Sequence, residues 1–120
     1  MKLAVIGSRG FDNYELVEQV LSDYKDKVSL VISGGAIGAD TLGEQWAKNN
    51  NINTVIYPAD WVKYGKRAGF VRNNDIIYSC DVCVAFWDGE SRGTLDSIKK
   101  AESMGKEIIL IKYMEELNDN

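Results

Sequence analysis

Short apolar runs rich in β-branched residues alternate along this chain with longer stretches of helical spacing, and this alternation limits the possible folds more than any other feature. The extended runs cover residues 2–7, 28–33, 53–57, 81–86 and 107–111. Because a helical segment separates successive runs, neighbouring strands run parallel, and helices cover both faces of a parallel sheet. We therefore predict an α/β fold: a Rossmann-like three-layer sandwich around a five-stranded parallel sheet.

The helical stretches have recognisable faces and ends. In the first, apolar residues recur at i, i+3, i+4 and i+7, namely Val17, Val20, Leu21 and Tyr24. Asp12 followed by Glu15 is similar to a capping box, so Asp12 is the predicted N-cap. Further helices are expected at 39–49, at 69–79 and from about Thr94 to Gly105, a predicted C-cap. The one long connection, residues 59–68, is predicted to be a lid or binding loop.

Length and charge narrow the class of protein. A chain of 120 residues suits a single domain over residues 1–120, with 113–120 as an acidic tail. The sequence enters a strand directly after Met1, without a secretory leader, and no apolar run approaches the roughly 20 residues of a membrane span. We therefore expect a cytoplasmic protein without membrane contact. A net charge of −4 opposes attraction to polyanions, so nucleic acid is not an expected partner.

The chain contains no histidine, which excludes Ser-His-Asp and Cys-His catalysis and most transition-metal sites. We expect neither a metal nor a cofactor, so any chemistry must use carboxylates, hydroxyls, arginine or water. Cys80 and Cys83 form a C-x-x-C, but on an extended segment their Cα atoms lie roughly 10 Å apart, too far for a disulfide. Buried or half-buried free thiols are favoured over a redox or metal role.

Arginines and glycines gather in the connections that follow the strands. All four arginines fall in loops or at helix starts, at Arg9, Arg67, Arg72 and Arg92. These connections lie at the carboxyl edge of a parallel sheet, where ligands bind at the switch point of strand order. With the predicted order 3-2-1-4-5, residues 7–9 face residues 86–88 across that point. Backbone amides and guanidinium groups there predict an anion-binding edge.

The second connection, residues 33–40, is a glycine-rich turn from a strand into a helix and lets a phosphate approach the backbone closely. Such turns also occur simply to pack a helix on a strand. It is neither a dinucleotide fingerprint nor a Walker loop, because G-x-G-x-x-G and G-K-[ST] are absent. Asp40 either meets ribose hydroxyls or favours the positive end of the helix, and its position leaves both roles open.

Other connections carry further candidates. Ser91, Gly93 and Thr94 either bind a phosphate or cap the fourth helix. Arg72, followed by Asn73 in the third helix, either contacts a ligand or forms a surface ion pair. The aromatic side chains of the connections either stack on a base or pack under the long connection, and they are Trp61, Tyr64 and Trp87.

Five ordered motifs extend over nearly the whole chain: Gly7-Ser8-Arg9, Gly34-Gly35-Ala36-x-Gly38-Ala39-Asp40, Pro58-Ala59-x-Trp61, Ala68-Gly69-x-x-Arg72-Asn73 and Ser91-x-Gly93-Thr94. Together they resemble the YspA-like (YAcAr) branch of the SLOG superfamily. The resemblance implies a Rossmann-like domain for a nucleotide or nucleotide-derived ligand such as ADP-ribose. The predicted ligand-binding set is Gly7, Ser8, Arg9, Gly34, Gly35, Ala36, Gly38, Asp40, Pro58, Trp61, Arg72, Asn73, Trp87, Ser91, Gly93 and Thr94.

The LOG branch of that superfamily contains phosphoribohydrolases, which cleave the N-glycosidic bond of nucleoside monophosphates. Arg72 matches an arginine of those enzymes and Asp96 lies in their acidic region, so these two are the candidate catalytic residues. Asn73 and Ser97 replace their lysine and glutamate. Binding or sensing of an AMP- or ADP-ribose-like ligand is therefore the first hypothesis, and hydrolysis the alternative. LOG enzymes associate through helices, so a homodimer is suggested by analogy.

Overall fold

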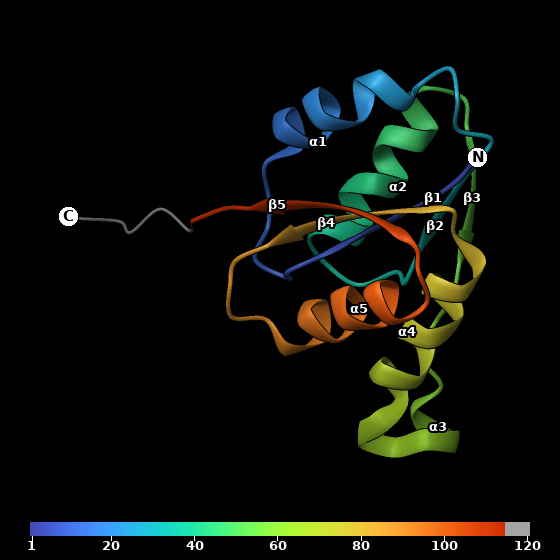
Figure 1. Ribbon diagram of the computed structural model, residues 1–120, viewed down its shortest axis with the longest axis vertical. Helices are drawn as coiled ribbons and strands as arrows, with labels where there is room; N and C mark the ends of the chain where they lie inside the picture. Colours follow the sequence, from blue (N-terminus) through green and yellow to red (C-terminus); the bar gives the residue numbers. More distant parts are fainter. Residues whose placement is uncertain (115–120) are drawn as a thin grey trace.

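The computed structural model describes residues 1–114, in which parallel strands form a five-stranded sheet in the order β3-β2-β1-β4-β5 (Figure 1). The strands are β1 (Lys2–Gly7), β2 (Leu30–Ser33), β3 (Asn53–Ile56), β4 (Val82–Trp87) and β5 (Glu107–Lys112). The predicted fold class and strand order are confirmed. The predicted tail lies mostly outside the described residues.

Alternating side chains of the strands build two cores, one on each face of the sheet. On β1, Leu3 and Val5 join the core beneath α1 (Tyr14–Leu21) and α2 (Ala39–Asn49). Ala4 and Ile6 point to the other face, beneath α4 (Ala68–Ser79) and α5 (Arg92–Ser103). Figure 1 shows these helix pairs on opposite sides of the sheet. This is the three-layer arrangement that burial of a parallel sheet requires.

Helix ends follow local hydrogen bonding, which corrects one prediction. The side chain of Asn13 accepts from the Leu16 amide at 3.0 Å and is the N-cap of α1, so the assignment of Asp12 was wrong by one residue. A 3-10 turn, η1 (Ser22–Tyr24), continues α1. At the end of α5, Gly105 has a φ of 69° and is the predicted glycine stop after the last turn.

The connection of residues 59–68, predicted as a loop, contains two short helical elements, α3 (Trp61–Tyr64) and η2 (Gly65–Arg67). Asp60 caps α3 by accepting from the Lys63 amide at 3.0 Å, and Gly65 ends it with a φ of 58°. In Figure 1 this segment projects beyond the layers at the N-terminal start of α4. The prediction missed α3 because one helical turn is too short to show apolar periodicity.

Other features of the described residues bear on the earlier expectations. Cys80 and Cys83 are buried free cysteines, and burial raises the pKa of both thiols.

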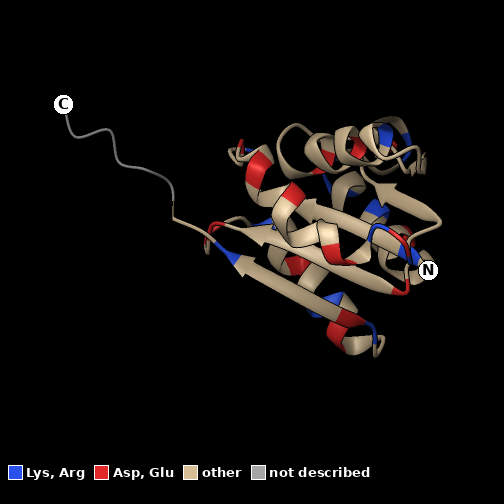
Figure 2. Cartoon of the chain, turned by 90° about the horizontal axis from the view of Figure 1, so that it is seen from above, with Lys and Arg blue, Asp and Glu red and all other residues tan. Residues whose placement is uncertain are grey.

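Acidic and basic residues are mixed along the helices and strand ends (Figure 2). Within residues 1–114, none of the helices combines the length and apolar character needed to cross a membrane.

Candidate functional site

The strand order reverses between β1 and β4, and the loops that follow these strands are joined there. The Ser8 amide donates to the carbonyl of Phe86 at 3.0 Å, and the Ser8 hydroxyl accepts from the Asp88 amide at 3.1 Å. Ser8 is buried, with 1% of its surface exposed. The predicted meeting of residues 7–9 with residues 86–88 is therefore observed, and Ser8 is the residue that fixes it.

The glycine turn that leads into α2 packs against the same loop. A Cβ atom on Gly38 would lie 2.4 Å from the Ser8 carbonyl oxygen, and Gly38 has a φ of 96°. The backbone conformation and the space both require glycine. The Ala39 amide, at the start of α2, donates to the same Ser8 oxygen at 3.4 Å. Gly38 thus lets α2 approach β1 and itself lies outside the pocket lining.

Asp40 holds the glycine turn from inside. Its Oδ2 accepts from the Gly34 amide at 3.0 Å, and Nη1 of Arg72 donates to the Gly34 carbonyl at 2.7 Å. Only 5% of Asp40 is exposed. Burial raises the pKa of Asp40 from 3.8 to about 6, against the opposing effects of Arg72 and the amides of Gly34 and Ala36, while Glu44 adds to the rise.

The start of α5 is ordered by internal hydrogen bonds. Asp88 Oδ1 accepts from the amides of Glu90 and Ser91, both at 2.8 Å, and these bonds lower the pKa of Asp88. The Ser91 side chain caps the helix through the Thr94 amide. A Cβ on Gly93 would meet nothing within 4 Å, so open space lies beside this turn. The positive end of a helix dipole favours negative charge at such a start.

Asn73 connects α4 to this helix start. Its Nδ2 donates to the Gly93 carbonyl at 3.3 Å and to Asp96 Oδ2 at 3.2 Å, while its Oδ1 accepts from Arg72 Nε at 3.3 Å. Asp96 also forms a salt bridge of 2.6 Å with Lys100. Asp96 is outside the pocket lining, and its contacts orient Asn73 and Lys100.

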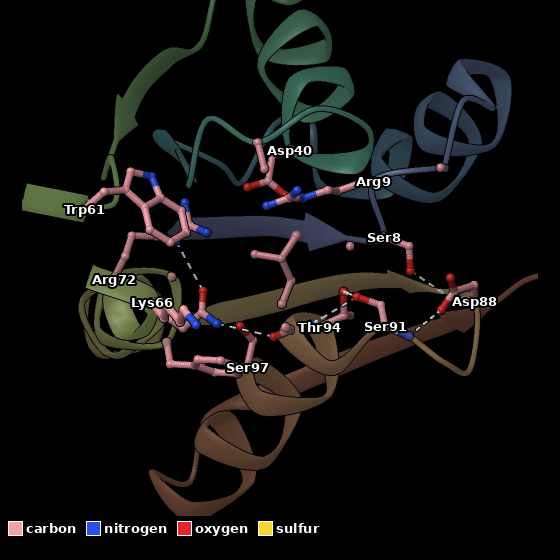
Figure 3. A pocket seen from close by; sticks show the side chains of 18 residues that line it. Ser8, Arg9, Asp40, Trp61, Lys66, Arg72, Asp88, Ser91, Thr94 and Ser97 are labelled. Carbon is pink, nitrogen blue, oxygen red and sulfur yellow. Dashed lines mark hydrogen bonds between the residues drawn. The ribbon is translucent and has the colours of Figure 1, made fainter. Parts of the chain in front are cut away.

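These elements surround a cavity of about 430 Å³, here called the main pocket (Figure 3). Its lining comprises Ile6, Gly7, Ser8, Arg9, Gly10, Ala36, Asp40, Trp61, Lys66, Gly69, Phe70, Arg72, Asn73, Asp88, Ser91, Gly93, Thr94 and Ser97. In Figure 3, Trp61, Lys66 and Arg72 lie at one end, and Ser8, Asp88 and Ser91 lie at the other. The pocket therefore has an aromatic end and a helix-start end.

A second hollow of about 430 Å³, the side pocket, adjoins the aromatic end. It shares Arg9, Ala36, Trp61 and Arg72 with the main pocket. Its remaining lining is Gly34, Gly35, Glu44, Ile56, Pro58 and Ala59. The two hollows together reach from the start of α5 to the carboxyl end of β3.

Most of the predicted ligand-binding residues line one of the two pockets, and Gly38 and Trp87 do not. Trp87 packs against the core beneath α4 and α5, and its Nε1 donates to the Ser91 carbonyl at 3.0 Å. Of the four arginines, Arg9 and Arg72 line the main pocket, while Arg67 and Arg92 are exposed outside it. Tyr64 also lies outside both linings.

The sequence reasoning missed Lys66 and Phe70, which line the main pocket. Together with Gly69 and Asn73 they follow a helical i, i+3, i+4, i+7 spacing along η2 and α4. This helical spacing indicates that Lys66 and Phe70 share a face with Asn73. The prediction did not include it because residues 59–68 were assigned to a loop.

The fold and this cleft define a class: a Rossmann-like α/β protein whose pocket lies at the switch point of a parallel sheet. Within that class, the chain belongs to the YspA, cpYpsA-related SLOG family, whose model matches residues 1–64. Gene 61 protein of Mycobacterium phage D29 is 32% identical in an alignment of 117 residues that covers 90% of this chain and 94% of that protein.

Solved structures show the same fold at low identity. DNA processing protein A (DprA) from Streptococcus pneumoniae matches with a TM-score of 0.77 and 21% sequence identity. The match covers 98% of this chain and 52% of that protein, so this chain spans about half of its length. DNA processing protein A from Helicobacter pylori matches with a TM-score of 0.74 and 19% identity, over 98% of this chain and 67% of that protein. That protein is described for its single-stranded DNA binding mode. TM1055 matches with a TM-score of 0.68 and 20% identity, over 89% of this chain and 71% of that protein.

Proposed function

We propose that this protein binds a nucleotide or nucleotide-derived ligand, of the AMP or ADP-ribose type, in the main pocket. Membership of a SLOG family supports a nucleotide-related function. The observation that carries the proposal is one pocket that combines a helix start, the cations Arg9, Lys66 and Arg72, and exposed aromatic rings. This combination suits a molecule with an anionic end and a planar end.

The phosphate belongs at the start of α5. Thr94 and Ser91 place hydroxyls there, the helix dipole favours negative charge, and Gly93 leaves room for close approach. Arg9 lines both pockets, is exposed, and forms no salt bridge among residues 1–114, so it can supply a counter-charge to an anionic ligand. A guanidinium group with no internal carboxylate partner is available for an external anion.

The planar part belongs at the aromatic end. Trp61 is 56% exposed and Phe70 is 43% exposed, although both line the pocket. Large apolar side chains exposed beside a cavity gain contact area when a flat ring covers them. Asp40, between the two ends, is positioned to accept hydrogen bonds from sugar hydroxyls.

Single-stranded nucleic acid is the competing ligand to test. The charge-based expectation against nucleic acid is not supported by the Helicobacter pylori neighbour, which is described as binding single-stranded DNA. A likeness of 19% identity shows the fold alone. The net charge of −4 favours a small ligand with one or two phosphates over a polyanion.

Asp40 also gives hydrolysis of the glycosidic bond a specific basis. A buried carboxyl group with a pKa of about 6, facing the pocket, can exchange a proton near neutral pH. Asp96, the carboxylate predicted for this role, lies outside the pocket lining and is paired with Lys100. If the protein cleaves its ligand, Asp40 and Arg72 are the better placed pair.

Isothermal titration calorimetry with AMP, ADP, ADP-ribose and a short single-stranded oligonucleotide tests the proposal. We expect nucleotide binding, which Arg9→Ala weakens about tenfold or more by removing a charge-assisted contact. Arg67→Ala is the matched control, because it removes an exposed arginine outside the pocket lining. Equal effects of the two variants, or binding of the oligonucleotide alone, would contradict the proposal. Chromatography of the same mixtures for released base separates binding from hydrolysis.

A further inference from the structure

The side pocket differs chemically from the main pocket. Ile56, Pro58 and Trp61 give it apolar walls, and Ile56 is 46% exposed although it lines a hollow. Its one acidic residue is Glu44. The guanidinium groups of Arg9 and Arg72 line this pocket as well, and Glu44 is the group in it that can accept hydrogen bonds from N–H groups through a carboxylate.

The glycine turn makes one surface of the side pocket from bare backbone. Gly34 and Gly35 both line it. A Cβ on Gly35 would lie 3.0 Å from Ile56 Cγ2, and Gly35 has a φ of 73°, so a side chain there would narrow the space and strain the backbone. The absence of a side chain on Gly35 keeps the hollow open beside Ile56, and its absence on Gly34 leaves room for Arg72 and Asp40.

Glu44 is held in position by a short chain of hydrogen bonds. Ser33 Oγ donates to Glu44 Oε2 at 2.8 Å and accepts from the Gly35 amide at 3.0 Å. Among residues 1–114, Glu44 takes part in no salt bridge. A carboxylate offers about four acceptor positions, so Glu44 keeps capacity for a ligand while its orientation is fixed.

Trp61 lines both pockets, so a base stacked on its ring lies where the pockets meet. We propose that the side pocket reads the edge of the base, and that Glu44 selects bases with an exocyclic amino group over those with a carbonyl oxygen in its place. The proposal rests on the proposed function, because it requires a nucleotide in the main pocket. Its physical basis is that an amino group donates to the carboxylate, whereas a carbonyl oxygen brings acceptor against acceptor.

Calorimetry with matched nucleoside monophosphates tests this selection: AMP against IMP, and CMP against UMP. In each pair the second base carries a carbonyl oxygen where the first carries the amino group. We expect AMP to bind about tenfold more tightly than IMP, and CMP about tenfold more tightly than UMP. Glu44→Gln is expected to reduce these ratios at least fivefold, because an amide can donate to a carbonyl oxygen.

Glu18→Gln, an exposed position on α1, is the control and is expected to leave every ratio unchanged. Glu44→Gln retains an acceptor for Ser33, and an unchanged melting temperature will confirm that it folds. Nucleotide binding with equal affinities in every pair, or ratios unaffected by Glu44→Gln, overturns the role of Glu44 and leaves the proposed function standing. Failure of all four nucleotides to bind overturns both.

Discussion

At the scale of single residues, Asp40 has the most unusual environment of the site. Its carboxyl group is buried against the glycine turn, close enough to Arg72 and Glu44 for both to influence its pKa. The sequence placed an acid at a helix start, where the dipole stabilises the charged form. Burial outweighs that effect and raises the pKa to about 6, and no sequence pattern reveals the depth at which a side chain lies.

We predict that Asp40→Asn changes how stability depends on pH. Between pH 3.8 and about 6, folded Asp40 keeps a proton that the unfolded chain releases, so the wild-type protein loses stability as pH rises through this window. At about 1.4 kcal/mol per pH unit, the loss is on the order of 3 kcal/mol. Asparagine keeps an acceptor for the Gly34 amide and does not ionise.

Urea unfolding at several pH values between 4 and 8 measures this effect. Asp40→Asn should be close to wild type in free energy of unfolding at pH 4 and gain on it as pH rises to 7. A difference between the two proteins that stays constant over this range would show that Asp40 does not titrate with a raised pKa.

At the scale of elements, the alternation of apolar runs was sufficient to predict all five parallel strands, because this pattern is set by residues along whole strands. The strand order 3-2-1-4-5 was assumed with the fold class and is the order observed. The residues at which the helices begin were harder to predict from the sequence. Asp12 and Asn13 both carry a side-chain oxygen that can cap a helix, and the hydrogen bond to Leu16 settles the choice. The helical turns at 61–67 were missed, and with them the pocket residues Lys66 and Phe70.

Two glycines of the site should respond oppositely to alanine. Gly38→Ala places a Cβ against the Ser8 carbonyl in a conformation that only glycine adopts readily, so the free energy of unfolding should fall by roughly 2 kcal/mol or more. Gly93→Ala places its methyl group in open space in the first turn of α5, so the free energy of unfolding should not fall.

Gly93→Ala should instead weaken nucleotide binding, because its methyl group occupies the space proposed for the phosphate. Urea unfolding and calorimetry on both variants check the pair. If Gly93→Ala unfolds as easily as Gly38→Ala, or binds AMP like the wild type, then the turn at the start of α5 has a structural role alone.

At the scale of the whole molecule, a negatively charged chain brings together cations from two β-to-α crossovers. Arg9 follows β1, while Lys66 lies in η2 and Arg72 in α4. The sequence predicted such an edge from the position of arginines, yet Arg67 and Arg92 are exposed outside the pocket lining. Which arginine faces the cleft depends on the phase of each helix, and this phase is set by packing on the sheet.

The most direct test of a nucleotide site at the carboxyl edge is an NMR titration of the ¹⁵N-labelled protein with AMP. We predict saturable shifts of the Gly93 and Thr94 amides at the start of α5. The Lys2 amide, which donates to Asp81 at 2.8 Å at the opposite edge of the sheet, should remain unchanged. Shifts confined to that opposite edge, or no saturable shift at Gly93 and Thr94, would contradict the account.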